Sequence, residues 1–249
     1  MADTLVKVEN LSKNFDKLVV LHDVSVEVTR GENLVVFGKS GSGKSVLLKC
    51  IIGLMKPDSG TIYINSKNVL SLSLKELNEV RKNIGFLFQG AALYDSMTVR
   101  ENLEFPLKRH FTEMTPSQIE EKVKYTLDLV SLEEAIDKMP SELSGGMKKR
   151  IGLARSIITD PALMLYDEPT TGLDPITTKE ISELILNLQK KLNMTSIVVT
   201  HDLICAEIIA DRAIFLRDAR VAFEGDIKEL TKSDDPFLKN FFSHEIIKV

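Results

Sequence analysis

The amino-acid sequence predicts an α/β fold built on a parallel sheet, and three observations support this prediction. Short apolar runs of the kind buried in parallel sheets alternate with segments of helical spacing along the chain. A glycine-rich loop, "GKSGSGKS", joins one such run to a helical segment. Residues 90–160, by contrast, contain helical patterns without a good strand, which indicates a helical insertion.

The first part of the chain contributes strands and one helix. The segment "TLVKVENL" alternates between apolar and polar residues and predicts a strand, and the valines of "VSVEV" mark a second strand that ends at Arg30-Gly31. The continuous apolar run "NLVVF" predicts a buried parallel strand. A helix follows in "KSVLLKCIIGL", and "GTIYINSKNV" predicts a strand that runs into a turn.

The second part of the chain begins with the insertion, in which "TPSQIEEKVKYTLDLVSL" and "SGGMKKRIGLARSII" predict helices. Sheet character returns with "ALMLY", "SIVVT" and the hairpin "AIFLRDARVAFEG". We therefore expect a single domain in three parts: a core over residues 1–89 and 161–225, a helical subdomain over 90–160, and a helical tail over 226–249.

The tail has a distinct apolar pattern. Pro236 suits the first turn of a helix, and four large apolar side chains then recur at helical spacing. These four residues are Phe237, Leu238, Phe241 and Phe242. Such a row predicts a docking surface, most simply on the chain's own core, with a second copy or an accessory protein as the alternatives.

The composition is ordinary for a soluble globular protein. The 249 residues are 43% hydrophobic and 27% charged, and the net charge of −4 disfavours nucleic acid as the main partner. Cys50 and Cys205 each lie in an apolar helical pattern, so we expect two buried thiols in a reducing compartment. No apolar run approaches the ~20 residues of a membrane span, and the N-terminus has no apolar signal core. We expect a cytosolic protein, or one that a partner holds at a membrane.

The glycine-rich loop predicts a phosphate-binding site. It fits the pattern G-x-x-x-x-G-K-S, and it has the preceding strand and following helix that this motif requires. Lys44 would neutralise charge on the β- and γ-phosphates, and the Ser45 hydroxyl would bind Mg²⁺. For Lys39, which the motif does not require, a solvated charge is the simpler expectation. The residues expected around the phosphates are Gly38, Lys39, Ser40, Gly41, Ser42, Gly43, Lys44, Ser45 and Val46.

The segment "ALMLYDEPTTGLDP" places two acidic residues at the end of an apolar strand. The carboxyl end of a parallel strand faces the ligand crevice. Asp167 could hold Mg²⁺, and Glu168 could accept a proton from a water in line with the γ-phosphate. A glutamate that caps the next helix is the alternative, which Pro169 would also fit; beside the phosphate loop we favour the base.

Three single residues extend this predicted site. Gln89 follows the apolar run "IGFLF", and its amide could sense Mg²⁺ and the attacking water, although a surface glutamine is the commoner role. His201 follows "SIVVT" and would point at the γ-phosphate, or else bond backbone at a helix start. Phe15 could stack on the adenine or belong to the core.

A second candidate anion-binding element begins 100 positions after Lys44, at Ser144. In "SELSGGMKKRIGLARSI" a polar start and two glycines precede apolar residues at helical spacing, which leaves backbone N–H groups open. It is too far along the chain to be part of the first loop.

The order of these motifs resembles that of the ATP-binding cassette (ABC) ATPases. The phosphate loop, Gln89, "LSGGM", "LMLYDE", "GLD" and His201 occur in one order across nearly the whole chain. The resemblance implies a P-loop NTPase core with an antiparallel β subdomain, and ATP and Mg²⁺ as cofactors. It also implies a head-to-tail homodimer in which the signature motif, Leu143–Met147, contacts the ATP bound to the second copy. Ser144, Gly145 and Gly146 would bind the partner's γ-phosphate, and Asp174 would cross the interface.

A narrower resemblance is to the ATPases of bacterial Mla phospholipid transporters and their plastid relatives. It rests on "FQGAALYDSMTVRENLEFPL", on "LSGGMKKR" with Met147 where the commonest signature has Gln, and on "DEPTTGLDPIT". It implies a peripheral protein on the cytoplasmic face of the inner membrane, with multi-span permease subunits and an MCE-type lipid-binding protein as partners. Residues Ala91, Ala92, Leu93, Tyr94 and Phe105 would line a groove for a permease helix, or simply pack the insertion.

Other functions stay open at this point. Amino-acid importers keep a near-identical scaffold, so import of another small solute is the first alternative. ABC ATPases of DNA repair usually carry long coiled coils or zinc modules between the phosphate loop and the signature, and those of translation carry two cassettes. The short interval and single cassette here disfavour both classes.

Overall fold

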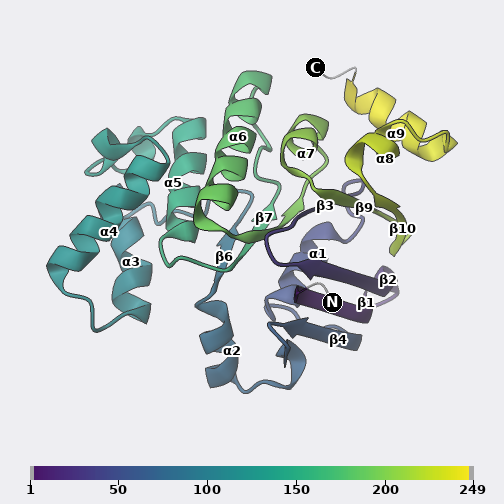
Figure 1. Cartoon of the computed structure of the whole chain (residues 1–249), viewed down its shortest axis with the longest axis horizontal. Helices are drawn as coiled ribbons and strands as arrows, with labels where there is room; N and C mark the ends of the chain where they lie inside the picture. The colour runs from purple at the N-terminus through teal and green to yellow at the C-terminus, as the bar shows by residue number, and fades with distance from the viewer. Residues whose placement is uncertain (1–2, 247–249) are drawn as a thin grey trace.

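The computed structural model describes residues 3–246, which form two β-sheets with helices around them (Figure 1). The 4-stranded sheet has the order β2-β1-β4-β5 and is antiparallel throughout. Its strands are β1 (Thr4–Phe15), β2 (Leu18–Thr29), β4 (Ser59–Ile64) and β5 (Lys67–Asn68). The antiparallel subdomain implied by the sequence resemblance is therefore present.

The first strand is longer than its alternating pattern predicts. The pairing of β1 with β2 shifts register between Val8 and Leu11, and Asn10 there has the positive φ of 50°. The Asn10 side-chain amide donates to Asp23 on β2 at 2.7 Å, which holds this irregularity in place. Beyond it the strand resumes its pairing and continues to Phe15.

The 6-stranded sheet has the order β10-β9-β3-β8-β7-β6. Five of its strands run parallel: β3 (Asn33–Phe37), β6 (Ile84–Leu87), β7 (Leu163–Asp167), β8 (Thr195–Val199) and β9 (Arg212–Arg217). The edge strand β10 (Arg220–Gly225) pairs antiparallel with β9, as the predicted hairpin requires. Every residue of β3, β7 and β8 is buried, which explains their continuous apolar runs.

The two faces of this sheet belong to different hydrophobic cores. Along β3, Leu34 and Val36 join a core shared with the 4-stranded sheet and with α1 (Lys44–Ile51). Val35 and Phe37 point the other way, into a core shared with the helical insertion and the tail. Alternating side chains of one strand thus attach both halves of the protein to the same sheet.

The helical insertion gathers at one end of the molecule (Figure 1). It contains α3 (Val99–His110), α4 (Pro116–Leu129) and α5 (Gly145–Ile157), with short 3-10 turns at Glu133–Ala135 and Pro140–Glu142. The sequence predicted helices in this region. It did not predict α2 (Leu74–Arg81), which follows a 3-10 turn at Val69–Ser71. Val80 is the one buried residue of α2, and Leu77 packs partly buried against the core, so the apolar face of this helix is narrow. Its start is capped by a capping box between Ser73 and Glu76.

The remaining helices follow the last strands of the sheet. They are α6 (Pro175–Leu192), α7 (Leu203–Ile209), α8 (Ile227–Thr231) and α9 (Pro236–Ile246).

Both cysteines are buried, as predicted. Burial raises the thiol pKa of Cys50 to about 11 and that of Cys205 to about 12.

The tail helix α9 packs on the chain's own core, which was the simplest of the three expectations. Leu238 and Phe242 are buried, and the Phe242 ring lies edge-on to Phe37 of β3 with their centroids 5.6 Å apart. Phe241 meets Phe215 of β9 in the same way at 4.8 Å. Residues 247–249 of the predicted tail lie outside the described residues.

Deleting residues 235–249 will lower the thermal stability of the dilute, nucleotide-free protein. The deletion uncovers Phe37 and Phe215, and a buried aromatic side chain contributes roughly 1.5–3 kcal/mol to the free energy of unfolding. Differential scanning calorimetry of the full and shortened chains measures the change in melting temperature. An unchanged melting temperature would contradict packing of α9 on its own core.

Candidate nucleotide-binding and catalytic site

A cleft at the carboxyl ends of β3, β7 and β8 collects most of the predicted site residues. It has a volume of about 780 Å³. The predicted residues that line it are Phe15, Lys39, Ser40, Gly41, Ser42, Gly43, Lys44, Ser45, Val46, Gln89, Glu168 and His201. Gly38 and Asp167 adjoin it through bonds to Lys44 and Ser45. The fold brings these residues together from five separate parts of the sequence.

The glycine-rich loop can follow its course only with a glycine at position 43. Gly43 has a φ of 96°, and a Cβ there would lie 2.5 Å from the Val20 carbonyl oxygen and 2.9 Å from the Leu21 side chain. A side chain would therefore push the loop away from β2. Because α1 begins at Lys44, the N–H groups of its first turn open at the loop, where an anion is stabilised.

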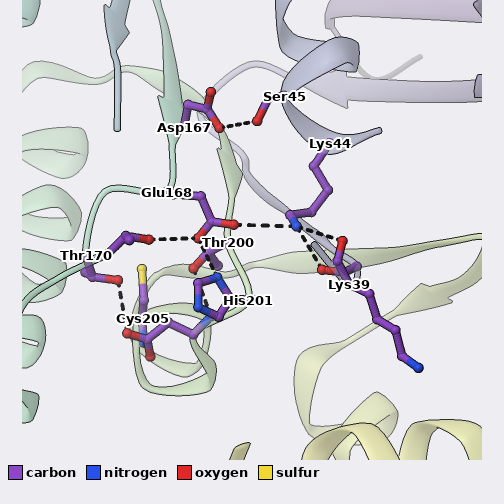
Figure 2. Close-up of polar contacts among 12 residues, drawn as sticks. Lys39, Lys44, Ser45, Asp167, Glu168, Thr170, Thr200, His201 and Cys205 are labelled. Atoms are coloured by element: carbon purple, nitrogen blue, oxygen red, sulfur yellow. Dashed lines mark hydrogen bonds and ion pairs between the residues drawn. The ribbon is translucent and has the colours of Figure 1, made fainter. Parts of the chain in front are cut away.

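Lys44 is buried, and its ammonium group is held between the loop and the end of β7 (Figure 2). Its Nζ donates to the Gly38 carbonyl at 2.8 Å and lies 3.5 Å from Oε1 of Glu168. The positive charge thus lies inside the cleft. Its electrostatic effect is stronger there than in bulk solvent, because the protein interior screens charge less than water does.

Two oxygen ligands suited to Mg²⁺ meet at the base of the cleft. The Ser45 hydroxyl donates to Oδ1 of Asp167 at 2.7 Å, although the two residues are 122 positions apart (Figure 2). No group of three or more His, Cys, Asp or Glu side chains suited to a metal occurs among residues 3–246. One carboxylate beside one hydroxyl fits Mg²⁺, which protein sites usually hold through few side chains together with phosphate and water.

Glu168 and His201 form a direct pair. Nδ1 of His201 lies 2.8 Å from Oε2 of Glu168, and the Glu168 side chain is only 12% exposed. The Glu168 backbone is left-handed, with a φ of 51°, and its N–H donates to the Val199 carbonyl at 2.8 Å. This unusual backbone turns the side chain from the end of β7 into the cleft.

The surroundings of Glu168 keep its carboxylate charged. Burial by itself would raise the pKa of Glu168, but the hydrogen bond from His201 and the charges of His201 and Lys44 outweigh it. The pKa is therefore lower than that of an ordinary glutamate. At neutral pH the carboxylate is ionised, so it accepts the bond from His201 and Nδ1 of the imidazole is the donor.

The sequence analysis missed one wall of the cleft. Phe237, Asn240 and Phe241 of α9 line it together with the glycine-rich loop. Lys39 is exposed, as expected for a solvated charge, and its ammonium also lies 5.4 Å from the centre of the Phe237 ring. The helical spacing of the aromatic residues predicted a docking surface, but no local pattern could say that it lay beside a loop about 200 residues away. Phe15, in turn, is 43% exposed and so is not a core residue.

The signature residues and Asp174 do not line the cleft. Ser144 is exposed and caps α5 by accepting the Met147 N–H at 3.2 Å. Asp174 caps α6 in the same way, because its carboxylate accepts bonds from the backbone and hydroxyl of Thr177. The two helix starts are neighbours, since a Cβ on Gly146 would lie 3.1 Å from the Thr177 methyl group.

Two of the five residues expected to line a groove for a permease helix do line a cleft. Ala91 and Ala92 line a cleft of about 200 Å³ together with Phe86, Pro106 and Arg155. The other three expected residues do not line it. Leu93 packs against the core, and the Tyr94 and Phe105 rings meet edge to face with their centres 5.1 Å apart. In the part of the chain that the structure describes, none of the helices is long and apolar enough to cross a membrane.

A family model described as "ABC transporter" matches residues 21–171. The chain belongs to this family. ABC ATPases bind and hydrolyse ATP, so the chain is an ATPase, and the resemblance noted in its motifs is confirmed.

Similar proteins carry out different kinds of transport. The "Intermembrane phospholipid transport system ATP-binding protein MlaF" of Haemophilus influenzae is 40% identical over 98% of this chain and 92% of its own length. The "Probable ribonucleotide transport ATP-binding protein mkl" of Mycobacterium leprae is 39% identical over 96% of this chain and 68% of its own. The "Methionine import ATP-binding protein MetN" of Campylobacter jejuni is 36% identical over 95% and 75%, respectively.

The fold is confirmed by a solved structure, the ATP-binding cassette MJ0796 as a dimer with ADP and Pi. It superimposes with a TM-score of 0.81 at 33% identity and covers 89% of this chain and 98% of that one. The predicted fold class, a P-loop core with an antiparallel β subdomain and a helical insertion, is therefore right.

Replacing His201 by Ala will raise the pKa of Glu168. The substitution removes the strongest of the interactions that lower this pKa and leaves the opposing effect of burial. In the wild type the Glu168 carboxylate stays ionised at pH values below 4.5, the ordinary pKa of glutamate. In the variant the carboxylate will become protonated at a higher pH than in the wild type. Carboxyl-carbon NMR titration of the nucleotide-free protein measures both values. Equal pKa values would mean that Lys44 and the backbone alone set the charge.

Proposed function

We propose that this chain is the ATP-hydrolysing subunit of a transporter that moves phospholipid or another lipid between membranes. In this proposal two chains close head-to-tail around two Mg·ATP and drive a multi-span permease. One observation carries it: the cleft contains the glycine-rich loop, Glu168 and His201, whereas the second phosphate-binding element at Ser144 opens elsewhere on the same chain. A second chain would bring that element to the first chain's nucleotide.

Each part of the cleft has a role in holding Mg·ATP. The exposed ring of Phe15 stacks on the adenine, and the loop N–H groups with Lys44 hold the phosphates. Ser45 and Asp167 would hold Mg²⁺, with the Gln89 amide, which also lines the cleft, as a further ligand or sensor. When bound, Mg²⁺ neutralises charge on the transferred phosphoryl group.

Glu168 is the general base in this proposal. Its ionised Oε atoms accept a proton from the attacking water, and His201 fixes the direction of the carboxylate through the 2.8 Å contact. The Glu168 side chain is 12% exposed and Lys44 is buried, so little bulk water surrounds the carboxylate and the electrostatic effect of Lys44 is strengthened.

The start of α5 serves the partner's nucleotide. Gly145 and Gly146 carry no side chain that would cover the first N–H groups of the helix, and Ser144 adds a hydroxyl. Met147 is half-buried against the chain's own core, so the change from Gln to Met leaves these groups in place. Asp174 lies at the neighbouring start of α6, which makes it an interface residue in the same dimer.

The proposal also assigns a permease partner and a lipid cargo. The small cleft beside Ala91 and Ala92 would take a helix of the permease, which would hold the chain on the cytoplasmic face of the inner membrane. An MCE-type protein would pass the lipid on. The 40% identity to a phospholipid transport protein and the "LSGGMKKR" and "DPIT" segments favour lipid. Import of an amino acid is the second candidate, since a methionine importer is 36% identical.

Complementation between two variants will test the head-to-tail dimer. Lys44→Ala disables a chain's own phosphate loop, and Ser144→Arg disables the element that it offers to its partner. A heterodimer with one substitution on each chain keeps one intact composite site. A heterodimer with both substitutions on one chain and none on the other keeps no intact site. We expect more tightly bound ATP in the first than in the second.

The two heterodimers contain the same set of side chains, so each is a matched control for the other. Purification through two different affinity tags removes the homodimers, and nucleotide bound per dimer is then measured after rapid filtration. Equal amounts in the two heterodimers would contradict the shared site.

The cargo is tested by isolating the intact transporter from the host membrane in detergent. We expect a multi-span permease, an MCE-type protein and bound phospholipid to co-purify with the chain, as identified by mass spectrometry. Addition of phospholipid to the reconstituted complex will stimulate ATP hydrolysis, whereas methionine will not. A partner that binds free amino acids, with stimulation by an amino acid, would refute lipid as the cargo.

A further inference from the structure

We propose that Lys149 is a positioning residue that ties the backbone of Glu168 and of Gln89 to the signature helix α5. The inference rests on the proposed role of Glu168 as the base. Lys149 lies in the second turn of α5 and is only 7% exposed. Its Nζ donates to the Gln89 carbonyl at 2.5 Å and to the Glu168 carbonyl at 3.4 Å.

A buried lysine in this place calls for a reason other than packing. Burial lowers the pKa of Lys149 below the ordinary lysine value, and the nearby charges of Glu168 and Asp167 offset this only in part. Lysine is almost never fully buried unless it is paired. In the described chain the buried lysines are Lys44 and Lys149, and both converge on Glu168: Lys44 approaches its carboxylate and Lys149 its main-chain carbonyl.

The contact with Glu168 bears on a backbone that needs support. Glu168 is left-handed, with a φ of 51°, a conformation that a side chain other than glycine keeps only when its surroundings hold it. Its N–H is bonded to the Val199 carbonyl of β8, and its carbonyl receives the bond from Lys149. Together these two bonds hold the peptide groups on either side of the residue that turns its carboxylate toward His201.

The contact with Gln89 extends the same support to the other side of the cleft. Gln89 follows β6 and lines the cleft, and Glu168 follows β7, the neighbouring strand. One ammonium group therefore joins both segments to α5, five residues after its cap at Ser144. A shift of α5 that engages the partner's nucleotide would move the carbonyls of Gln89 and Glu168 with it. In this way Lys149 couples the signature motif to the chain's own catalytic groups.

Replacing Lys149 by Met tests this role, because Met keeps a long unbranched side chain and removes the N–H donors. In the full-length wild-type background we expect kcat for ATP hydrolysis to fall by roughly 10- to 100-fold, since a misplacement of about 1 Å in a site can cost about 100-fold. KM for ATP should stay within about twofold, because the groups that bind the nucleotide are untouched. Lys149→Arg, which restores donors, should recover most of the lost kcat.

Lys148→Met is the matched control, since Lys148 is the exposed neighbour on the same helix. All rates are corrected for the folded fraction from circular dichroism, so that a loss of stability alone leaves kcat unchanged. If Lys149→Met has the same kcat as Lys148→Met, or if Lys149→Arg recovers nothing, the positioning role is overturned. If Lys149→Met does not fold, Lys149→Leu, which also lacks N–H donors, replaces it, and a wild-type kcat in that variant overturns the proposal too.

Glu168→Gln separates this proposal from the proposed function. Loss of hydrolysis in Glu168→Gln with normal kcat in Lys149→Met refutes only the role of Lys149. Normal hydrolysis in Glu168→Gln refutes Glu168 as the base, and with it the basis of the present inference.

Discussion

The carboxylate of Glu168 is nearly buried and nevertheless charged, and the rest of the site depends on how that charge is maintained. Burial favours the protonated form, so a neutral environment would leave no proton acceptor at this position. The charge persists because His201 bonds one carboxylate oxygen and the Lys44 ammonium lies 3.5 Å from the other. These three groups come from different segments, so only the folded chain brings together the interactions that offset the effect of burial on this carboxylate.

The strand order of the 6-stranded sheet makes this meeting possible. Strands β3, β8 and β7 are adjacent and parallel, so the residues that follow them emerge side by side at one edge. Lys44, His201 and Glu168 follow these strands in that order. Most residues of these strands are apolar, and each strand is buried along its whole length. The apolar core and the polar cleft are thus consequences of the same arrangement.

The helices around the sheet extend the site in two directions. On one side, the N-terminus of α5 lies outside the cleft, and Lys149 of the same helix bonds the carbonyl groups of Gln89 and Glu168. On the other side α9 packs its aromatic rings on β3 and β9 and forms part of the cleft wall beside Lys39. The candidate catalytic groups therefore lie between the helical insertion and the tail helix, and both elements make contacts with segments of the cleft.

The sequence by itself determined the fold class, the strands and the phosphate loop, because apolar periodicity and motif spacing are local properties of a chain. It also indicated Glu168 and His201, but not that they bond to each other. The short helix α2 escaped prediction because it is mostly exposed, with Val80 buried and Leu77 partly buried as its contacts with the core. Only the tertiary structure decided the destination of α9 and the partners of Lys149, since these contacts join residues that lie far apart in the chain, 60 positions in the case of Lys149 and Gln89. Such contacts depend on which strands become neighbours in the sheet, and no pattern within one segment carries that information.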